Sequence, residues 1–336
     1  MRRADLDLCR VIACLAVTAI HTVMLFWDFP PASPAWAVWN LLSLAVRFGV
    51  PLFFLLGGAL LLGREKLDFR RHLRRILHLI VLFYVWAAIC RCLDAACGRV
   101  WTDGEPMGLL ILQGYYHLWF LPALALCYCA LPLLHGAIRG GADNLRRGAL
   151  LLFFVVLALA VLDAVPGKPE WLAALLRPWR LSHLRYLIYL PLGRLLAERK
   201  LSGRALTALG LASLAFLLLF AFLNRRAALA AGRAVDVYYG YLTPSAALSA
   251  CFVFALCRRL GSRAERHAAL LRILSGCTLG VYLIHPILID LLRGRVDFAA
   301  HSAVWLFPVS YLTAVLLPLG LTLLLKKIPL VKALVS

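Results

Sequence analysis

Long apolar runs recur along almost the whole chain, and they restrict its fold more than any other feature. Hydrophobic residues make up 63% of the 336 residues and the mean hydropathy is +0.86, so too few polar residues remain to cover a soluble core. We divide the chain into about ten runs that approach the length of a bilayer-spanning helix. They lie at 9–27, 36–62, 76–96, 117–135, 148–163, 183–197, 205–223, 241–258, 270–292 and 304–325.

These runs predict an all-α, polytopic membrane protein with about ten transmembrane helices. No internal repeat or second soluble domain interrupts them, so we expect one integral-membrane domain over residues 1–336. The lipid bilayer is then the first partner of the chain, and a cell (inner) membrane its expected location.

Basic residues account for the net charge of +20, and most of them lie in short clusters between the apolar runs. Because cytoplasmic loops carry an excess of Lys and Arg, this distribution places both termini in the cytoplasm. A nucleic-acid partner is not expected, since no basic patch interleaved with aromatic residues forms a soluble module. The clusters lie at 64–75, 139–147, 199–204, 258–272 and 326–332.

The ten cysteines form no Cys-x-x-Cys pair, and most lie inside apolar runs. Cysteine in such surroundings behaves as a small hydrophobic residue. We therefore expect neither a metal site nor a disulfide framework.

The first apolar run contains two ionisable residues, Arg10 and His21. Their separation of 11 positions corresponds to a rise of about 16 Å on a helix and returns to within about 20° of the same face. Ionisable groups inside a membrane are costly and are usually functional. The predicted topology puts Arg10 near the cytoplasmic side and His21 in the outer half. Asp7, three positions before Arg10, is placed to pair with it.

Other polar residues fall at the predicted depth of His21. They are His117, Trp119, Tyr282 and His285. Because histidine titrates near neutral pH, such a group is suited to proton transfer. Two structural interpretations stay open: His285 precedes Pro286 and could bond a carbonyl that the proline frees, and His117 could be an interfacial residue. Trp171 and Trp179 are interpreted as interface anchors.

The densest basic segment lies on the predicted inner side, at the depth of Arg10. It contains Arg70, Arg71, Arg74 and Arg75. Arginine binds phosphate groups bidentately, so this segment is a candidate site for a phosphorylated donor. Arg47, inside the second run beside Pro51, is assigned to the same donor side, and Pro51 predicts a tilt or kink there. The alternative is that the cluster only sets the topology.

Four segments, in order, resemble the acyltransferase 3 family of integral-membrane acyltransferases. The first runs from Asp7 to His21 and contains Arg-x10-His. The second is Val50-Pro51-Leu52-Phe53-Phe54-Leu55-Leu56-Gly57-Gly58. The third is His117-Leu118-Trp119-Phe120-Leu121 and the fourth is Gly280-Val281-Tyr282-Leu283-Ile284-His285-Pro286. Gly57 departs from the family pattern, because many members have Ser at this position.

The resemblance implies transfer of an acyl group, usually acetyl from acetyl-CoA, to a hydroxyl of a sugar, glycan or lipid-linked glycan. His21 matches the essential histidine, which we interpret as the general base, and Arg10 matches its paired arginine. Acyl-CoA is then a co-substrate, with no tightly bound cofactor. Arg10, Arg47 and the 70–75 cluster would hold the donor, while His117, Trp119, Tyr282 and His285 would line the acceptor side.

Two functions from other classes remain as alternatives. A transporter or flippase would use the outer histidines as a proton relay and Arg47 as a substrate anchor. It predicts inverted repeats and paired broken helices, and the sequence contains no sign of either. A non-catalytic membrane sensor with the same fold is the second alternative, since fold does not determine function.

Overall fold

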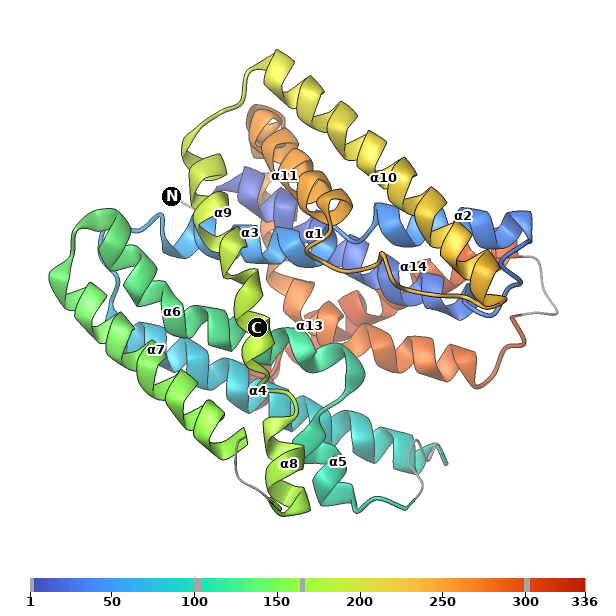
Figure 1. The fold of residues 1–336 in the computed structure, drawn as a ribbon, viewed down its shortest axis with the longest axis horizontal. Helices are drawn as coiled ribbons and strands as arrows, with labels where there is room; N and C mark the ends of the chain where they lie inside the picture. Colours follow the sequence, from blue (N-terminus) through green and yellow to red (C-terminus); the bar gives the residue numbers. More distant parts are fainter. Residues whose placement is uncertain (1–2, 99–103, 164–166, 299–302, 336) are drawn as a thin grey trace. The chain divides into compact units, whose positions relative to one another are not determined.

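The computed structural model describes residues 3–98, 104–163, 167–298 and 303–335, and these residues form helices with no strand (Figure 1). This confirms the all-α prediction. Several helices begin as their sequences indicate, with a Ser, Thr or Asp side chain that accepts a hydrogen bond from a backbone N–H in the first turn. Ser33, Asp68, Ser202 and Thr243 are such N-caps.

Eight helical segments in the described part of the chain are long and apolar enough to cross a membrane. They are Ala4–Phe26, Pro34–Leu61, Phe69–Ala96, Met107–Arg139, Asp143–Leu162, Gly203–Ala231, Ala268–Arg293 and Val304–Leu325. Each overlaps a predicted run, so the membrane-helix character holds, but the count of about ten is not confirmed.

The two other predicted runs are helical but differ from these eight. Run 183–197 forms the 3₁₀ helix η3 (Leu181–Ile188) and α9 (Tyr189–Glu198). Run 241–258 forms α11 (Pro244–Arg259), whose 16 residues rise about 24 Å, less than the roughly 30 Å of a hydrocarbon core. The orientation of the termini stays a prediction.

The chain divides into two compact units, of which the first comprises residues 1–56 and 195–336. Its central helix is α1 (Ala4–Val23), which packs against α2 (Pro34–Ala45), α11, α13 (Ala268–Arg293) and α14 (Ala303–Leu325). Helix α10 (Gly203–Ala231) lies along α11 and α2 (Figure 1). Short helices complete this unit: η1 (Met24–Phe26), α12 (Gly261–Glu265) and α15 (Pro329–Lys332).

Polar contacts fix the first turn of α1 to distant parts of this unit. Asp5 forms a buried ion pair with Arg258 at the end of α11. Arg258 also donates to the carbonyl of Ala197, at 2.9 Å. Ser275 of α13 donates to the Asp7 carboxylate at 2.7 Å. Because buried charged groups require such partners, these contacts hold the first turn of α1 against the rest of the unit.

The second unit comprises residues 57–194. Helix α6 (Phe120–Arg139) packs against α7 (Ala142–Asp163) and α4 (Phe69–Ala96). Helix α5 (Met107–Gln113) packs against α8 (Glu170–Leu176) and α4 (Figure 1). The 3₁₀ helix η2 (Tyr116–Trp119) leads into α6. Helices α5 and α8 lie between the predicted runs, because helices this short leave a weak periodic signal.

The predicted kink in the second run is a complete break. Helix α2 ends at Ala45, α3 spans Gly49–Leu61, and Arg47 lies in the intervening turn. Pro51 falls in the first turn of α3, where the N–H that proline lacks would have no intrahelical partner. The break therefore precedes the proline, and it places a cation between two helix ends.

Helix α3 approaches α9 through Gly58. A Cβ atom at Gly58 would overlap the backbone carbonyl of Leu190, whereas a Cβ at Gly57 would meet the Tyr128 hydroxyl at an ordinary 3.4 Å. Gly58 is therefore required by the packing of two backbones. Gly57, the position at which the sequence departs from the pattern it resembles, has room for a small side chain.

Candidate functional site

The structure brings His21 of α1 and His285 of α13 together. Their ring centroids lie 5.2 Å apart with the planes inclined at 53°. Tyr282 lies three positions before His285 on the same helix, with its ring centroid 6.3 Å from that of His285. Two segments that are more than 250 positions apart in sequence thus contribute to one cluster of titratable rings.

The two histidines differ in exposure. His285 is completely buried, and its Nδ1 donates to the Val281 carbonyl at 2.9 Å. In a neutral imidazole with Nδ1 protonated, the lone pair is on Nε2. His21 is only partly buried, so it is the more accessible of the two rings. The structural interpretation of His285 concerned a carbonyl that Pro286 frees, which is the carbonyl of Tyr282. The hydrogen bond from Nδ1 of His285 goes to the preceding carbonyl, that of Val281.

Two arginines lie close enough to His21 for their charges to act on it, Arg47 and Arg293. The Arg47 guanidinium lies 4.8 Å from the ring centroid of Tyr239 and 5.5 Å from that of Tyr241, and its Nη1 donates to the Tyr241 hydroxyl at 3.3 Å. The aromatic faces partly replace water around this cation. Sequence reasoning did not single out Arg293, which gives little signal because it lies at a helix end.

Arg10 and His21 lie on one uninterrupted helix, Ala4–Val23. The rise of about 16 Å between them, expected from their spacing, therefore applies to the folded chain. Arg10 is partly exposed. Asp7 has Ser275 as a partner, a contact that no sequence pattern could reveal, and its pairing with Arg10 stays a prediction.

In the second unit, the basic segment forms the first turns of α4 and lines a cavity of about 360 Å³, which we call the Arg74 cavity. Arg71, Arg74, Arg75, His78 and Tyr128 are among its lining residues. Positions 71, 74, 75 and 78 follow the i, i+3, i+4, i+7 pattern of one helix face. That pattern was the available signal for His78, which the sequence analysis missed. Arg70 is not among the residues that line the cavity.

The N-terminus of α4 adds to the positive potential of this region. Asp68 caps the helix by accepting a hydrogen bond from the Arg71 backbone N–H at 3.1 Å. This hydrogen bond, with the nearby arginine charges, holds the pKa of the exposed Asp68 carboxyl below its ordinary value. His72 Nε2 donates to the Tyr128 carbonyl at 2.8 Å and thereby fixes α4 against α6.

His117 and Trp119 lie in an aromatic cluster of the second unit. His117 is 1% exposed, and its ring centroid lies 5.6 Å from that of Tyr115. Trp119 packs near Tyr186 and His183, at centroid distances of 5.8 and 5.9 Å. His117 and Trp119 thus each pack among aromatic rings of their own unit. In the described residues, no group of three His, Cys, Asp or Glu side chains could hold a metal ion.

Comparison with known proteins gives one family and one relative. The family model of an acyltransferase domain, acyltransferase 3, matches residues 3–326. A protein of Enterococcus faecalis described as an amino-acid racemase is 33% identical over 132 residues, which is 36% of this chain and 18% of that protein. The chain thus matches only a small part of that relative. No solved structure matches the chain.

Proposed function

The chain belongs to the acyltransferase 3 family, and on that premise we propose that it is a membrane O-acyltransferase with His21 as its general base. The donor is a cytoplasmic acyl-CoA, with acetyl-CoA the first choice. The acceptor is a hydroxyl of a sugar, a cell-envelope glycan or a lipid-linked glycan. The protein would work in the cell (inner) membrane.

The observation that carries this proposal is the partly exposed His21 beside the buried His285. In the proposed reaction, His21 removes the proton of the acceptor hydroxyl while the oxygen attacks the thioester carbonyl carbon. The C–S bond then breaks, and the thiolate of CoA takes up the proton from the imidazolium. A positioned base of this kind contributes about 10²–10⁴-fold to the rate.

The neighbours of His21 have supporting roles in the proposal. Arg47 and Arg293, whose charges reach His21, would stabilise the negative charge that develops on the thioester oxygen. His285, held by the Val281 carbonyl, would orient His21. Tyr282, together with His117 and Trp119 of the second unit, would contact the acceptor.

The Arg74 cavity supports the donor half of the proposal. Three arginines that line one cavity suit the phosphates of CoA, because guanidinium groups bind phosphate oxygens bidentately. Arg70 and Arg10 would add positive charge to the donor side. The rise of about 16 Å along α1 is of the order that a pantetheine arm must cross to reach His21.

The test is acyl transfer from radiolabelled acetyl-CoA in membranes that contain the wild-type protein or His21→Gln, with equal protein levels. We expect a loss of about 10²–10⁴-fold in His21→Gln, while the exposed control His267→Gln keeps wild-type turnover. Full turnover in His21→Gln would refute the base assignment. Solute uptake into proteoliposomes without thiol release would favour a transporter, and acetyl-CoA binding without turnover would favour a sensor.

A further inference from the structure

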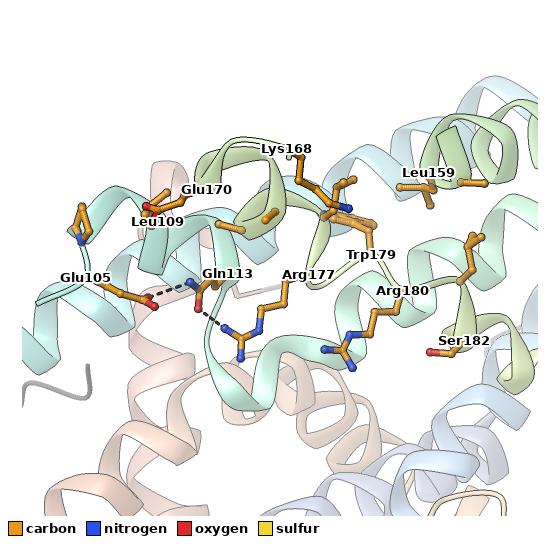
Figure 2. Close-up of a pocket in the computed structure, with 16 residues that line it drawn as sticks. Glu105, Leu109, Gln113, Leu159, Lys168, Glu170, Arg177, Trp179, Arg180 and Ser182 are labelled. Atoms are coloured by element: carbon orange, nitrogen blue, oxygen red, sulfur yellow. Dashed lines mark hydrogen bonds between the residues drawn. The ribbon is translucent and has the colours of Figure 1, made fainter. Parts of the chain in front are cut away.

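A cavity of the second unit has a volume of about 810 Å³, and none of the residues assigned above to catalysis or to donor or acceptor binding lines it. We call it the Arg177 cavity. It is lined by the end of α7, helices α5 and α8, and the segment that follows α8 (Figure 2). Its size falls in the range of small-molecule sites.

The Arg177 cavity combines three cations with two carboxylates: Lys168, Arg177 and Arg180 with Glu105 and Glu170. Arg177 Nη1 donates to Gln113 Oε1 at 2.6 Å, and Gln113 Nε2 donates to Glu105 Oε2 at 3.0 Å (Figure 2). This chain of hydrogen bonds holds the Arg177 guanidinium in place. A guanidinium has five N–H donors, more than one amide oxygen can accept.

Arg180 lies three positions after Arg177, and in Figure 2 the Arg177 side chain lies beside Gln113 while the Arg180 side chain extends toward the same side of the view. Both arginines are exposed. Two guanidinium groups in the lining of one cavity suit a phosphate or carboxylate, which accepts several charge-assisted hydrogen bonds. The carboxylates of Glu105 and Glu170 instead accept hydrogen bonds from hydroxyl groups. The lining therefore suits a ligand that carries both an anionic group and hydroxyls.

Trp179, which lies between these arginines in the sequence, is fixed by contacts to other side chains of the protein, unlike a simple interface anchor. Its Nε1 donates to the Tyr84 hydroxyl at 3.0 Å, and its ring meets the Phe83 ring edge-on at 6.1 Å. An interfacial tryptophan typically leaves its N–H to water or lipid headgroups. The fixed indole of Trp179 offers the cavity an apolar face, which suits the C–H face of a sugar ring.

We propose that the Arg177 cavity binds the acceptor, and that this acceptor is a sugar bearing a phosphate or a carboxylate. The identification of the ligand as the acceptor rests on the proposed acyltransferase function. The predicted topology supports it. With both termini in the cytoplasm, alternation of the membrane spans puts segments 94–116 and 164–182 on the outer side, the same side as His21. This holds whether eight or ten segments cross the membrane. A lipid headgroup also carries an anionic group that the arginines could bind, but it would not require the carboxylates of Glu105 and Glu170.

The test measures binding to the purified full-length protein in phosphatidylcholine nanodiscs by ligand-observed NMR. The probes are glucose 1-phosphate, glucuronic acid, glucose and inorganic phosphate. We expect both anionic sugars to bind at least tenfold more tightly than glucose or inorganic phosphate. Arg177→Gln, Arg180→Gln and Trp179→Ala should each weaken this binding at least tenfold. Arg146→Gln, an exposed arginine of α7 outside the cavity lining, should leave it unchanged.

Several results would overturn the proposal. Inorganic phosphate bound as tightly as glucose 1-phosphate would show a plain anion site. Loss of sugar binding when phosphatidylglycerol replaces phosphatidylcholine would identify a lipid headgroup as the occupant. Equal binding of all probes, or unchanged affinity in the cavity variants at an unchanged melting temperature, would remove the site altogether.

A second comparison separates this proposal from the proposed function. His21→Gln should bind both anionic sugars like the wild type, because His21 does not line the Arg177 cavity. Sugar binding without any acyl transfer by the wild type would reject the proposed function and keep the site. Acyl transfer that persists in Arg177→Gln and Arg180→Gln without sugar binding would reject the site and keep the function.

Discussion

The imidazole rings of His21 and His285, contributed by the first and the thirteenth α-helix, lie in contact distance at 5.2 Å between centroids. One ring is partly exposed and the other is fully buried. A pair of this kind is expected to work as a unit, in which the buried ring orients the accessible one.

A double-mutant cycle at this pair tests that coupling. We expect His285→Gln to lower acyl transfer at least tenfold, but less than His21→Gln, because the base remains and only its support is lost. The double variant should be no slower than His21→Gln alone. Rates of acetyl transfer at saturating acetyl-CoA give the three ratios. Multiplicative losses would show that the two residues act independently.

The Arg74 cavity predicts a difference between neighbouring arginines. Arg71→Gln and Arg74→Gln should raise the KM for acetyl-CoA about tenfold or more, since each removes a charge-assisted hydrogen bond. Arg70→Gln serves as the matched control and should have the smaller effect, because Arg70 does not line the cavity. The KM values are measured at fixed acceptor concentration. Equal effects of all three would indicate that the segment acts only as a general positive surface.

Adjacent glycines of α3 should respond in opposite ways. Gly58→Ala places a methyl group against the Leu190 backbone, and overpacking of this kind costs about 1–3 kcal/mol or more. Gly57→Ser has room beside the Tyr128 hydroxyl and should be tolerated. The melting temperatures of the detergent-solubilised proteins provide the measurement. A stable Gly58→Ala protein would contradict the backbone contact between α3 and α9.

The stability of the start of α4 should depend on pH through its N-cap residue, Asp68. Its pKa in the folded protein is held below the ordinary value of 3.8, chiefly by the hydrogen bond from the Arg71 N–H. Its ionised form therefore stabilises the fold above about pH 3.8, and this contribution is lost as the pH falls through the lower folded pKa. Asp68→Asn keeps a capping oxygen and should lack this component. Thermal unfolding of both proteins between pH 3 and pH 6 tests the difference, and parallel curves would contradict it.

The sequence predicted the helices well because each buries one apolar stripe or faces lipid along its whole length. The pairing of His21 with residues near position 285 was expected at the level of membrane depth. Other features depend on contacts between distant segments, which no local pattern encodes. The Ser275 hydroxyl on Asp7 and the approach of Gly58 to Leu190 are examples.

The features that the sequence analysis missed have particular physical reasons. Helices α5 and α8 have seven residues each, too few for a periodic pattern to distinguish them from loop. A tilt or kink was predicted beside Pro51, but the break falls earlier, at Arg47, because proline favours the first turn of a helix over its interior. Trp179 was interpreted as an interface anchor because its hydrogen bond to Tyr84 could not be foreseen: the two residues lie 95 positions apart.

The polar contacts that hold the start of α1 also bear on how the chain is made. Arg258 and Ser275 follow their partners Asp5 and Asp7 by 253 and 268 positions. At a synthesis rate of about 5–20 residues per second, the ribosome needs roughly 13–54 s to cover that interval. Helix α1 therefore completes its packing only after α11 and α13 have been synthesised.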